Sequence, residues 1–100
     1  MVEVRQTERF VRWLEGLRDL RGRATVLARI ERLIGGNPGD VKPVGAGVSE
    51  LRINYGPGYR VYYLQRGTAL IILLAGGDKG SQAKDIEEAL LWVANLTEEH

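Results

Sequence analysis

The middle of the chain alternates between apolar and polar positions, a pattern that predicts three consecutive strands. Over residues 50–55 every second residue is apolar, which is typical of a strand with one buried face. Residues 56–58, Gly-Pro-Gly, predict a tight turn. A second alternating run follows at residues 59–65, and residues 69–75 are apolar at every position, as in a strand covered on both faces. We therefore expect an antiparallel three-stranded meander.

Helical spacing of apolar residues predicts three helices around these strands. The first helix begins after Thr7 and the second spans residues 20–34 after Asp19, because both residues are good N-terminal caps. Their short connection predicts a helical hairpin. The third helix covers residues 81–96 and packs its apolar stripe on the sheet or on the first two helices.

The remaining segments complete a single domain over residues 1–100. Val2 and Val4 alternate within residues 1–6, which predicts an edge strand. Residues 35–47 contain five glycines and two prolines and predict a loop, without the spacing of a phosphate-binding glycine motif. We expect an α+β fold in which a helical hairpin and a C-terminal helix pack on a four-stranded, mainly antiparallel sheet.

Composition excludes several classes of function. The chain has no Cys, and its single His is the terminal residue His100, so disulfide frameworks, Cys-based zinc sites and His-dependent hydrolytic sites are not expected. Asp78 and Asp85 lie close to lysines that would compete with a metal, so neither a metal site nor a cofactor is expected. No run is long enough to span a bilayer and no signal peptide is visible, which favours a cytoplasmic protein without a membrane partner.

The charge is distributed unevenly along the chain. Residues 1–84 contain all 14 Lys and Arg and 8 of the 13 acids, giving +6, whereas residues 85–100 carry −5. The acids either solvate the last helix or complement a basic body that attracts a polyanion.

Cations on the predicted strands suggest chemistry on a phosphodiester. We expect four of them to lie near one another: Arg52, Arg60, Lys79 and Lys84. Fixed cations stabilise the charge that builds on phosphate oxygens when an RNA 2′-OH attacks its own phosphate. Three tyrosines nearby could stack on unpaired bases, and Lys42 could reach a ligand from the loop; the tyrosines are Tyr55, Tyr59 and Tyr62.

A purely structural interpretation of the same residues is also open. In that case Arg52 and Arg60 pair with nearby carboxylates, which would be Glu50 and either Asp78 or Asp85. The residues alone do not decide between these two interpretations.

Two motifs resemble a known family. The runs GVSELRINYGPGYRVYYLQRG and LLAGGDKGSQAKDIEEA are similar to the HigB-like addiction-module killer proteins of the RelE/ParE toxin superfamily. The order of the predicted elements agrees with that family over the whole chain. The resemblance implies the toxin of a type II toxin–antitoxin module, neutralised by a HigA-like antitoxin with a helix-turn-helix domain that contacts DNA on behalf of the complex.

The resemblance also implies an activity. RelE-like and HigB-like toxins are mRNA interferases that cut mRNA on the ribosome without a metal. Arg60 matches the arginine that contacts the scissile phosphate, Lys79 matches a second cation, and Arg52 and Lys84 are supporting cations. This chain departs from the family, whose RNA-cleaving members carry a Tyr or His near the C-terminus that moves protons, because it offers only Trp92 and the terminal His100 in that region. Either Lys79 or Lys84 takes that role, or cleavage is weak. A ParE-like gyrase inhibitor, or a toxin homologue that acts only by binding, is the alternative.

Overall fold

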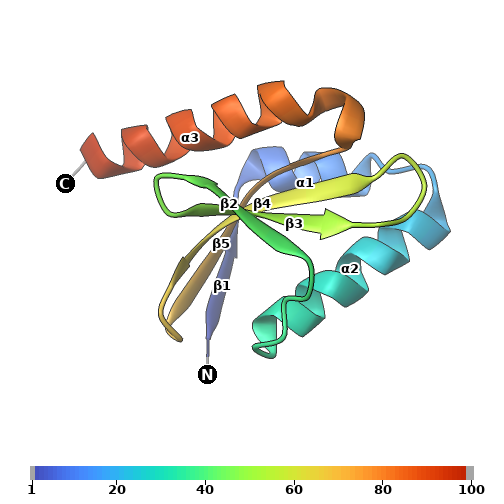
Figure 1. The fold of residues 1–100 in the computed structure, drawn as a ribbon, viewed down its shortest axis with the longest axis horizontal. Helices are drawn as coiled ribbons and strands as arrows, with labels where there is room; N and C mark the ends of the chain where they lie inside the picture. Colours follow the sequence, from blue (N-terminus) through green and yellow to red (C-terminus); the bar gives the residue numbers. More distant parts are fainter. Residues whose placement is uncertain (1, 99–100) are drawn as a thin grey trace.

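The computed structural model describes residues 2–98, with side chains described as far as Leu96, and contains an α+β arrangement of five strands and three helices. The chain order is β1 (Glu3–Gln6), α1 (Glu8–Glu15), α2 (Leu20–Ile34), β2 (Val41–Gly45), β3 (Val48–Ile53), β4 (Tyr59–Arg66), β5 (Leu70–Gly77), a 3₁₀ turn η1 (Lys79–Ser81) and α3 (Gln82–Glu98). Figure 1 shows α3 along one side of the sheet and α2 on the other.

The five strands form one mixed sheet in the order β1-β5-β4-β3-β2. The predicted meander is confirmed, since β3, β4 and β5 pair antiparallel in sequence order. The N-terminal strand pairs with β5 in a parallel orientation. Four strands were predicted, and that number is wrong because β2 forms inside the segment predicted as a loop. There Pro43 is accommodated at the edge of the sheet beside a register shift before Gly45.

The predicted helices are confirmed at their starting points. The Thr7 hydroxyl accepts a hydrogen bond from the backbone N–H of Phe10, and the Asp19 carboxylate accepts one from Gly22, so both helices begin at the expected caps. α1 packs on β5 and α2 on β3, so the two helices share one face of the sheet. The third helix begins after an extra 3₁₀ turn capped by Asp78.

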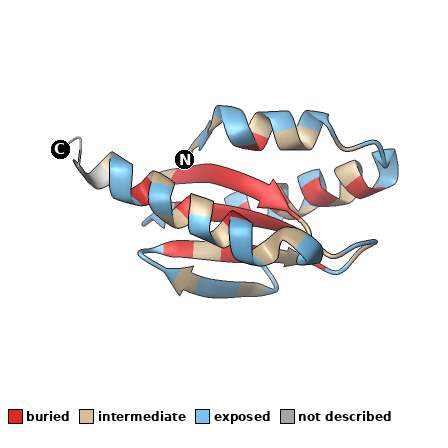
Figure 2. Ribbon diagram, turned by 90° about the horizontal axis from the view of Figure 1, so that it is seen from above, coloured by how far each residue is buried: buried red, intermediate tan, exposed pale blue. Residues whose placement is uncertain are grey.

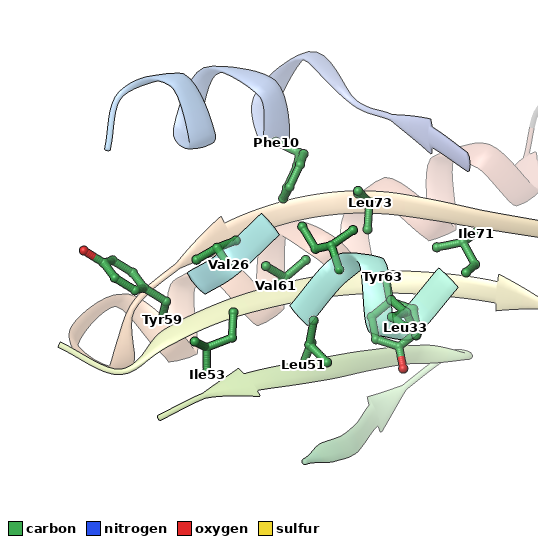
Figure 3. Packing of buried hydrophobic residues seen from close by; sticks show 11 residues of the cluster. Phe10, Val26, Leu33, Leu51, Ile53, Tyr59, Val61, Tyr63, Ile71 and Leu73 are labelled. Carbon is green, nitrogen blue, oxygen red and sulfur yellow. The ribbon is translucent and has the colours of Figure 1, made fainter. Parts of the chain in front are cut away.

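Two apolar clusters fill the space on the two faces of the sheet. The cluster under α1 and α2 includes Phe10, Val26 and Val61, all fully buried (Figure 3). The cluster under α3 includes Leu74 and Val93. The central strands β4 and β5 are buried on both sides, as Figure 2 shows, which explains the uninterrupted apolar run of β5.

A β-bulge near the end of β5 sets the faces of the residues that follow. Tyr62 pairs with Ala75 and Tyr63 with Leu73, which leaves Leu74 as an extra residue. As a result Gly76 lies against Trp13 of α1 and Gly77 lies against α3. A Cβ atom at Gly76 would come within 2.0 Å of the Trp13 ring, so a side chain has no room there.

Candidate functional site

A polar cleft of about 430 Å³ opens at the end of the sheet where β3 and β4 are joined by their turn. It is lined by Asp40, Arg52, Asn54, Gly56, Pro57, Gly58, Arg60 and Lys79. Three cations and one carboxylate therefore surround it. A cleft of this charge attracts an anion.

The arrangement of the strands brings the cleft arginines together. Arg52 of β3 is directly opposite Arg60 of β4 in the antiparallel register. Residues opposite each other project to the same face, so both side chains lie on the side covered by α3. Arg60 is almost buried, with 8% of its side chain exposed, whereas 40% of the Arg52 side chain is exposed.

The turn between β3 and β4 fixes Arg60 and Lys79 beside each other. Nη1 of Arg60 donates hydrogen bonds to the carbonyl oxygens of Gly58 and Tyr59, both at 3.2 Å. The backbone N–H of Lys79 donates to the carbonyl of Pro57 at 3.4 Å, which holds η1 against the turn. Gly58 has φ +78, a left-handed conformation that favours glycine, and a Cβ there would be in contact with the Lys79 Cβ at 3.4 Å.

A buried carboxylate, Glu50, lies beneath the two arginines. Its Oε2 accepts hydrogen bonds from the Tyr62 hydroxyl at 3.0 Å and from Nε2 of Gln82 at 2.8 Å. Its Oε1 lies 3.6 Å from Nε of Arg52 and 3.9 Å from Nε of Arg60. Burial raises the pKa of the Tyr62 phenol above its ordinary value, and the Glu50 charge raises it further. Tyr62 is thus a neutral donor to Glu50.

The structural interpretation of the arginines is confirmed for Glu50 and wrong for the other two acids. Asp78 caps η1, where it accepts hydrogen bonds from Gly80 and Ser81. Asp85 is buried and pairs with Arg9 of α1 at 2.8 Å. Neither aspartate forms an ion pair with the cleft arginines among the described residues.

The four predicted cations are not all brought together. Arg52, Arg60 and Lys79 line the cleft, but Lys84 is exposed on α3 and is not part of the lining. Lys42 is exposed on β2, opposite Glu50 in the register, and also lies outside the cleft lining.

The tyrosines do not accompany the cations as expected. Tyr55 and Tyr59 belong to the opposite face, where their rings stack at 6.5 Å and Tyr59 packs edge-on to Trp13. Tyr62 shares the face of the arginines but is fully buried. None of the three rings lines the cleft. The alternation of the strands already placed Tyr55 and Tyr59 on the face opposite to the arginines. The prediction that these tyrosines stack on RNA bases beside the cations did not take this into account.

Several residues of the site were not predicted as functional. Asp40 and Asn54 line the cleft at its rim. Arg29 of α2 supports that rim, because it donates to the carbonyls of Arg52 at 2.8 Å and Pro38 at 2.9 Å. The sequence gives no local signal for this support, since the contacts join segments that are distant in the chain.

Comparison with known proteins places the chain in a family. An uncharacterized protein of Haemophilus influenzae is 47% identical over 95 residues, covering 95% of this chain and 96% of that protein. The chain belongs to the family of that protein. No known family model and no solved structure matches the chain.

No helix within residues 2–98 has the length and apolar character required to cross a membrane. In the same part of the chain, no three acidic or imidazole side chains come together in a group able to hold a metal ion.

Proposed function

We propose that the protein is the toxin of a type II toxin–antitoxin module and a ribosome-dependent, metal-independent mRNA interferase of the cytoplasm. The observation that carries the proposal is the cleft with Arg52, Arg60 and Lys79 along its lining. The similarity of its motifs to HigB-like toxins of the RelE/ParE superfamily supports it. A HigA-like antitoxin with a helix-turn-helix domain is the proposed partner, and mRNA on the ribosome is the proposed substrate.

The proposed chemistry is intramolecular transesterification of RNA. The 2′-oxygen attacks the adjacent phosphorus, a P–O bond forms to give the 2′,3′-cyclic phosphate, and the bond to the 5′-oxygen breaks. Arg60 and Arg52 hold the phosphate oxygens, and planar guanidinium groups suit that geometry. Lys79 stabilises the negative charge that develops on these oxygens.

The cleft also contains groups that can move protons. Among the described residues, Asp40 is the one carboxylate in the lining, and it accepts the proton of the 2′-OH in the proposed reaction. The Lys79 ammonium donates a proton to the leaving 5′-oxygen. Lys84 is outside the lining, so we assign the proton-transfer role to Lys79.

One observation favours the alternative, in which the protein binds a target such as gyrase and breaks no bond. Among the residues that the structure describes, no Tyr or His side chain lines the cleft, and these are the two residue types that the similar RNA-cleaving toxins use near the C-terminus. His100 lies outside the described residues.

Induced expression in a bacterium without the antitoxin separates the two functions. We expect growth arrest with mRNA cut at codon boundaries during translation, mapped by primer extension. Arg60→Ala should abolish the cuts, and Arg66→Ala is the matched control, because Arg66 is an exposed arginine at the far end of β4. Growth arrest with intact mRNA and a DNA-damage response would refute the interferase and support the gyrase inhibitor.

A further inference from the structure

Glu50 is a buried carboxylate that is only half satisfied by hydrogen bonds. None of its surface is exposed, and its Oε2 is fixed by two donors from different elements, Tyr62 of β4 and Gln82 of α3. Its Oε1 accepts no hydrogen bond from the described residues and points to the Nε atoms of Arg52 and Arg60. A buried charge is costly unless it is paired, so the presence of a carboxylate at this buried position requires a reason.

The two arginines provide that reason. Arg52 and Arg60 are directly opposite each other on adjacent strands, where two like charges repel. Nε of Arg60 is itself buried without a hydrogen-bond partner among the described residues. The Glu50 carboxylate lies within 4 Å of both guanidinium groups and therefore offsets the repulsion between them.

A glutamine at position 50 would keep the contacts on the Oε2 side, because its carbonyl oxygen has two lone pairs and could accept from both Tyr62 and Gln82. Its amide group would then face the Nε–H donors of Arg52 and Arg60 with neither a charge nor an acceptor to offer them. The feature that only the carboxylate supplies is its negative charge, held in place at Oε2 and directed at the arginines from Oε1.

We propose that Glu50 is a positioning residue that holds Arg52 and Arg60 in the arrangement that receives the phosphate of the RNA substrate. The proposal rests on the interferase function above. Glu50 acts through the arginines, because its side chain has no exposed surface with which to contact the substrate. Gln82 extends the support to the first turn of α3, so the arginines depend on how that helix is docked.

Replacement of Glu50 by glutamine should separate binding from cleavage. Loss of one negative charge makes the cleft more positive, so RNA binding stays equal or becomes tighter. The guanidinium groups lose their fixed arrangement, and a misplacement of about 1 Å costs up to roughly 100-fold in rate. We therefore expect Glu50→Gln to cut about 10- to 100-fold more slowly at saturating protein, with an unchanged or lower half-saturating concentration.

Tyr62→Phe tests the same support without changing the charge of the site. It removes one of the two donors to Oε2, so cleavage should fall by about 3- to 10-fold. In a Glu50→Gln background the Tyr62 substitution should have no further effect, because Tyr62 acts through Glu50. Tyr63→Phe is the matched control, since Tyr63 is a buried tyrosine on the opposite face of the same strand.

The experiment measures single-turnover cleavage of mRNA on programmed ribosomes. It is combined with binding of a single-stranded oligonucleotide of 2′-O-methyl RNA, which cannot be cleaved by this route. NMR spectra of the arginine Nε–H groups report the arrangement directly, with the Arg60 signal assigned from an Arg60→Lys spectrum. Slower cleavage without weaker binding, together with a shifted or broadened Arg60 signal in Glu50→Gln, is the expected result.

These measurements distinguish a refuted interferase function from a refuted positioning role of Glu50. If the natural protein does not cut mRNA, the interferase function is refuted, and the Arg60 signal alone then decides whether Glu50 positions the arginine. If the natural protein cuts and Glu50→Gln cuts equally fast with an unchanged Arg60 signal, the positioning role is refuted. If Glu50→Gln does not fold, Tyr62→Phe decides, and cleavage equal to that of Tyr63→Phe refutes the proposal.

Discussion

Gly77 determines how closely α3 can approach the sheet, and replacing it by alanine should be strongly destabilising. A Cβ atom at this position would lie 1.8 Å from Oδ2 of Asp85 and 2.7 Å from Oγ of Ser81. An ordinary contact would require the Asp85 carboxylate to move by about 1.5 Å. Asp85 is buried and accepts hydrogen bonds from Arg9 at 2.8 Å and from Ser81 at 2.5 Å, and such a movement breaks both.

The magnitude follows from these contacts. Forcing an extra methyl group into a packed site costs about 1–3 kcal/mol. The lost hydrogen bonds to a charged group add about 1.5–3 kcal/mol, but 43% of the Arg9 side chain is exposed, so solvent recovers part of this loss. We expect Gly77→Ala to lower the free energy of unfolding by about 2–4 kcal/mol, which corresponds to a fall in Tm of about 10 °C or more.

Urea denaturation followed by circular dichroism measures this difference. Gly35→Ala is the matched control, because Gly35 has φ −76 and the nearest atoms to an added Cβ are backbone oxygens at an ordinary 3.5 Å. That variant should change the free energy of unfolding by less than about 0.5 kcal/mol. A loss below about 0.5 kcal/mol for Gly77→Ala would refute the docking of α3 through Asp85.

Two further predictions concern the cleft and the buried tyrosines. The logarithm of the binding constant for single-stranded RNA falls linearly with the logarithm of the salt concentration, and Lys79→Ala should reduce the size of this slope by about 0.7. Lys84→Ala should leave the slope unchanged. An equal reduction by both variants would contradict the assigned cleft. Burial raises the pKa of Tyr59, Tyr62 and Tyr63 above 10.0, so the unfolded chain loses these protons first. The free energy of unfolding, measured by urea denaturation at each pH, should therefore be highest below about pH 10 with respect to these groups and should fall as the pH rises further. The fall should be less steep in Tyr62→Phe. A free energy of unfolding that does not change with pH in this range would contradict the burial of the tyrosines.

The sequence allowed most of the fold to be predicted because its signals are local. Alternation assigned the faces of β3 and β4 correctly, and the capping residues Thr7 and Asp19 fixed the starts of α1 and α2. β2 was missed because Pro43 and the neighbouring glycines are typical of a loop. Only its pairing with β3 makes that segment a strand, and pairing is not a local property.

The candidate site could be predicted only in part, for a related reason. Arg52, Arg60 and Lys79 were expected together and do line one cleft. The burial of Glu50 was not expected, because alternation shows that a residue shares a face with other polar residues but not that α3 will cover that face. Lys84 was placed near the other cations by its position in the sequence, but it is exposed on α3 and is not part of the cleft lining.

The most direct test of the interferase function is cleavage of a defined mRNA by the purified protein on programmed ribosomes, comparing the natural sequence with Arg60→Ala and Arg66→Ala. We expect cuts by the natural protein and by Arg66→Ala, and none by Arg60→Ala at a concentration where the circular dichroism spectrum of that variant shows a folded protein. Equal cutting by all three proteins would contradict the assignment of the cleft. No cutting by any of them would contradict the interferase itself.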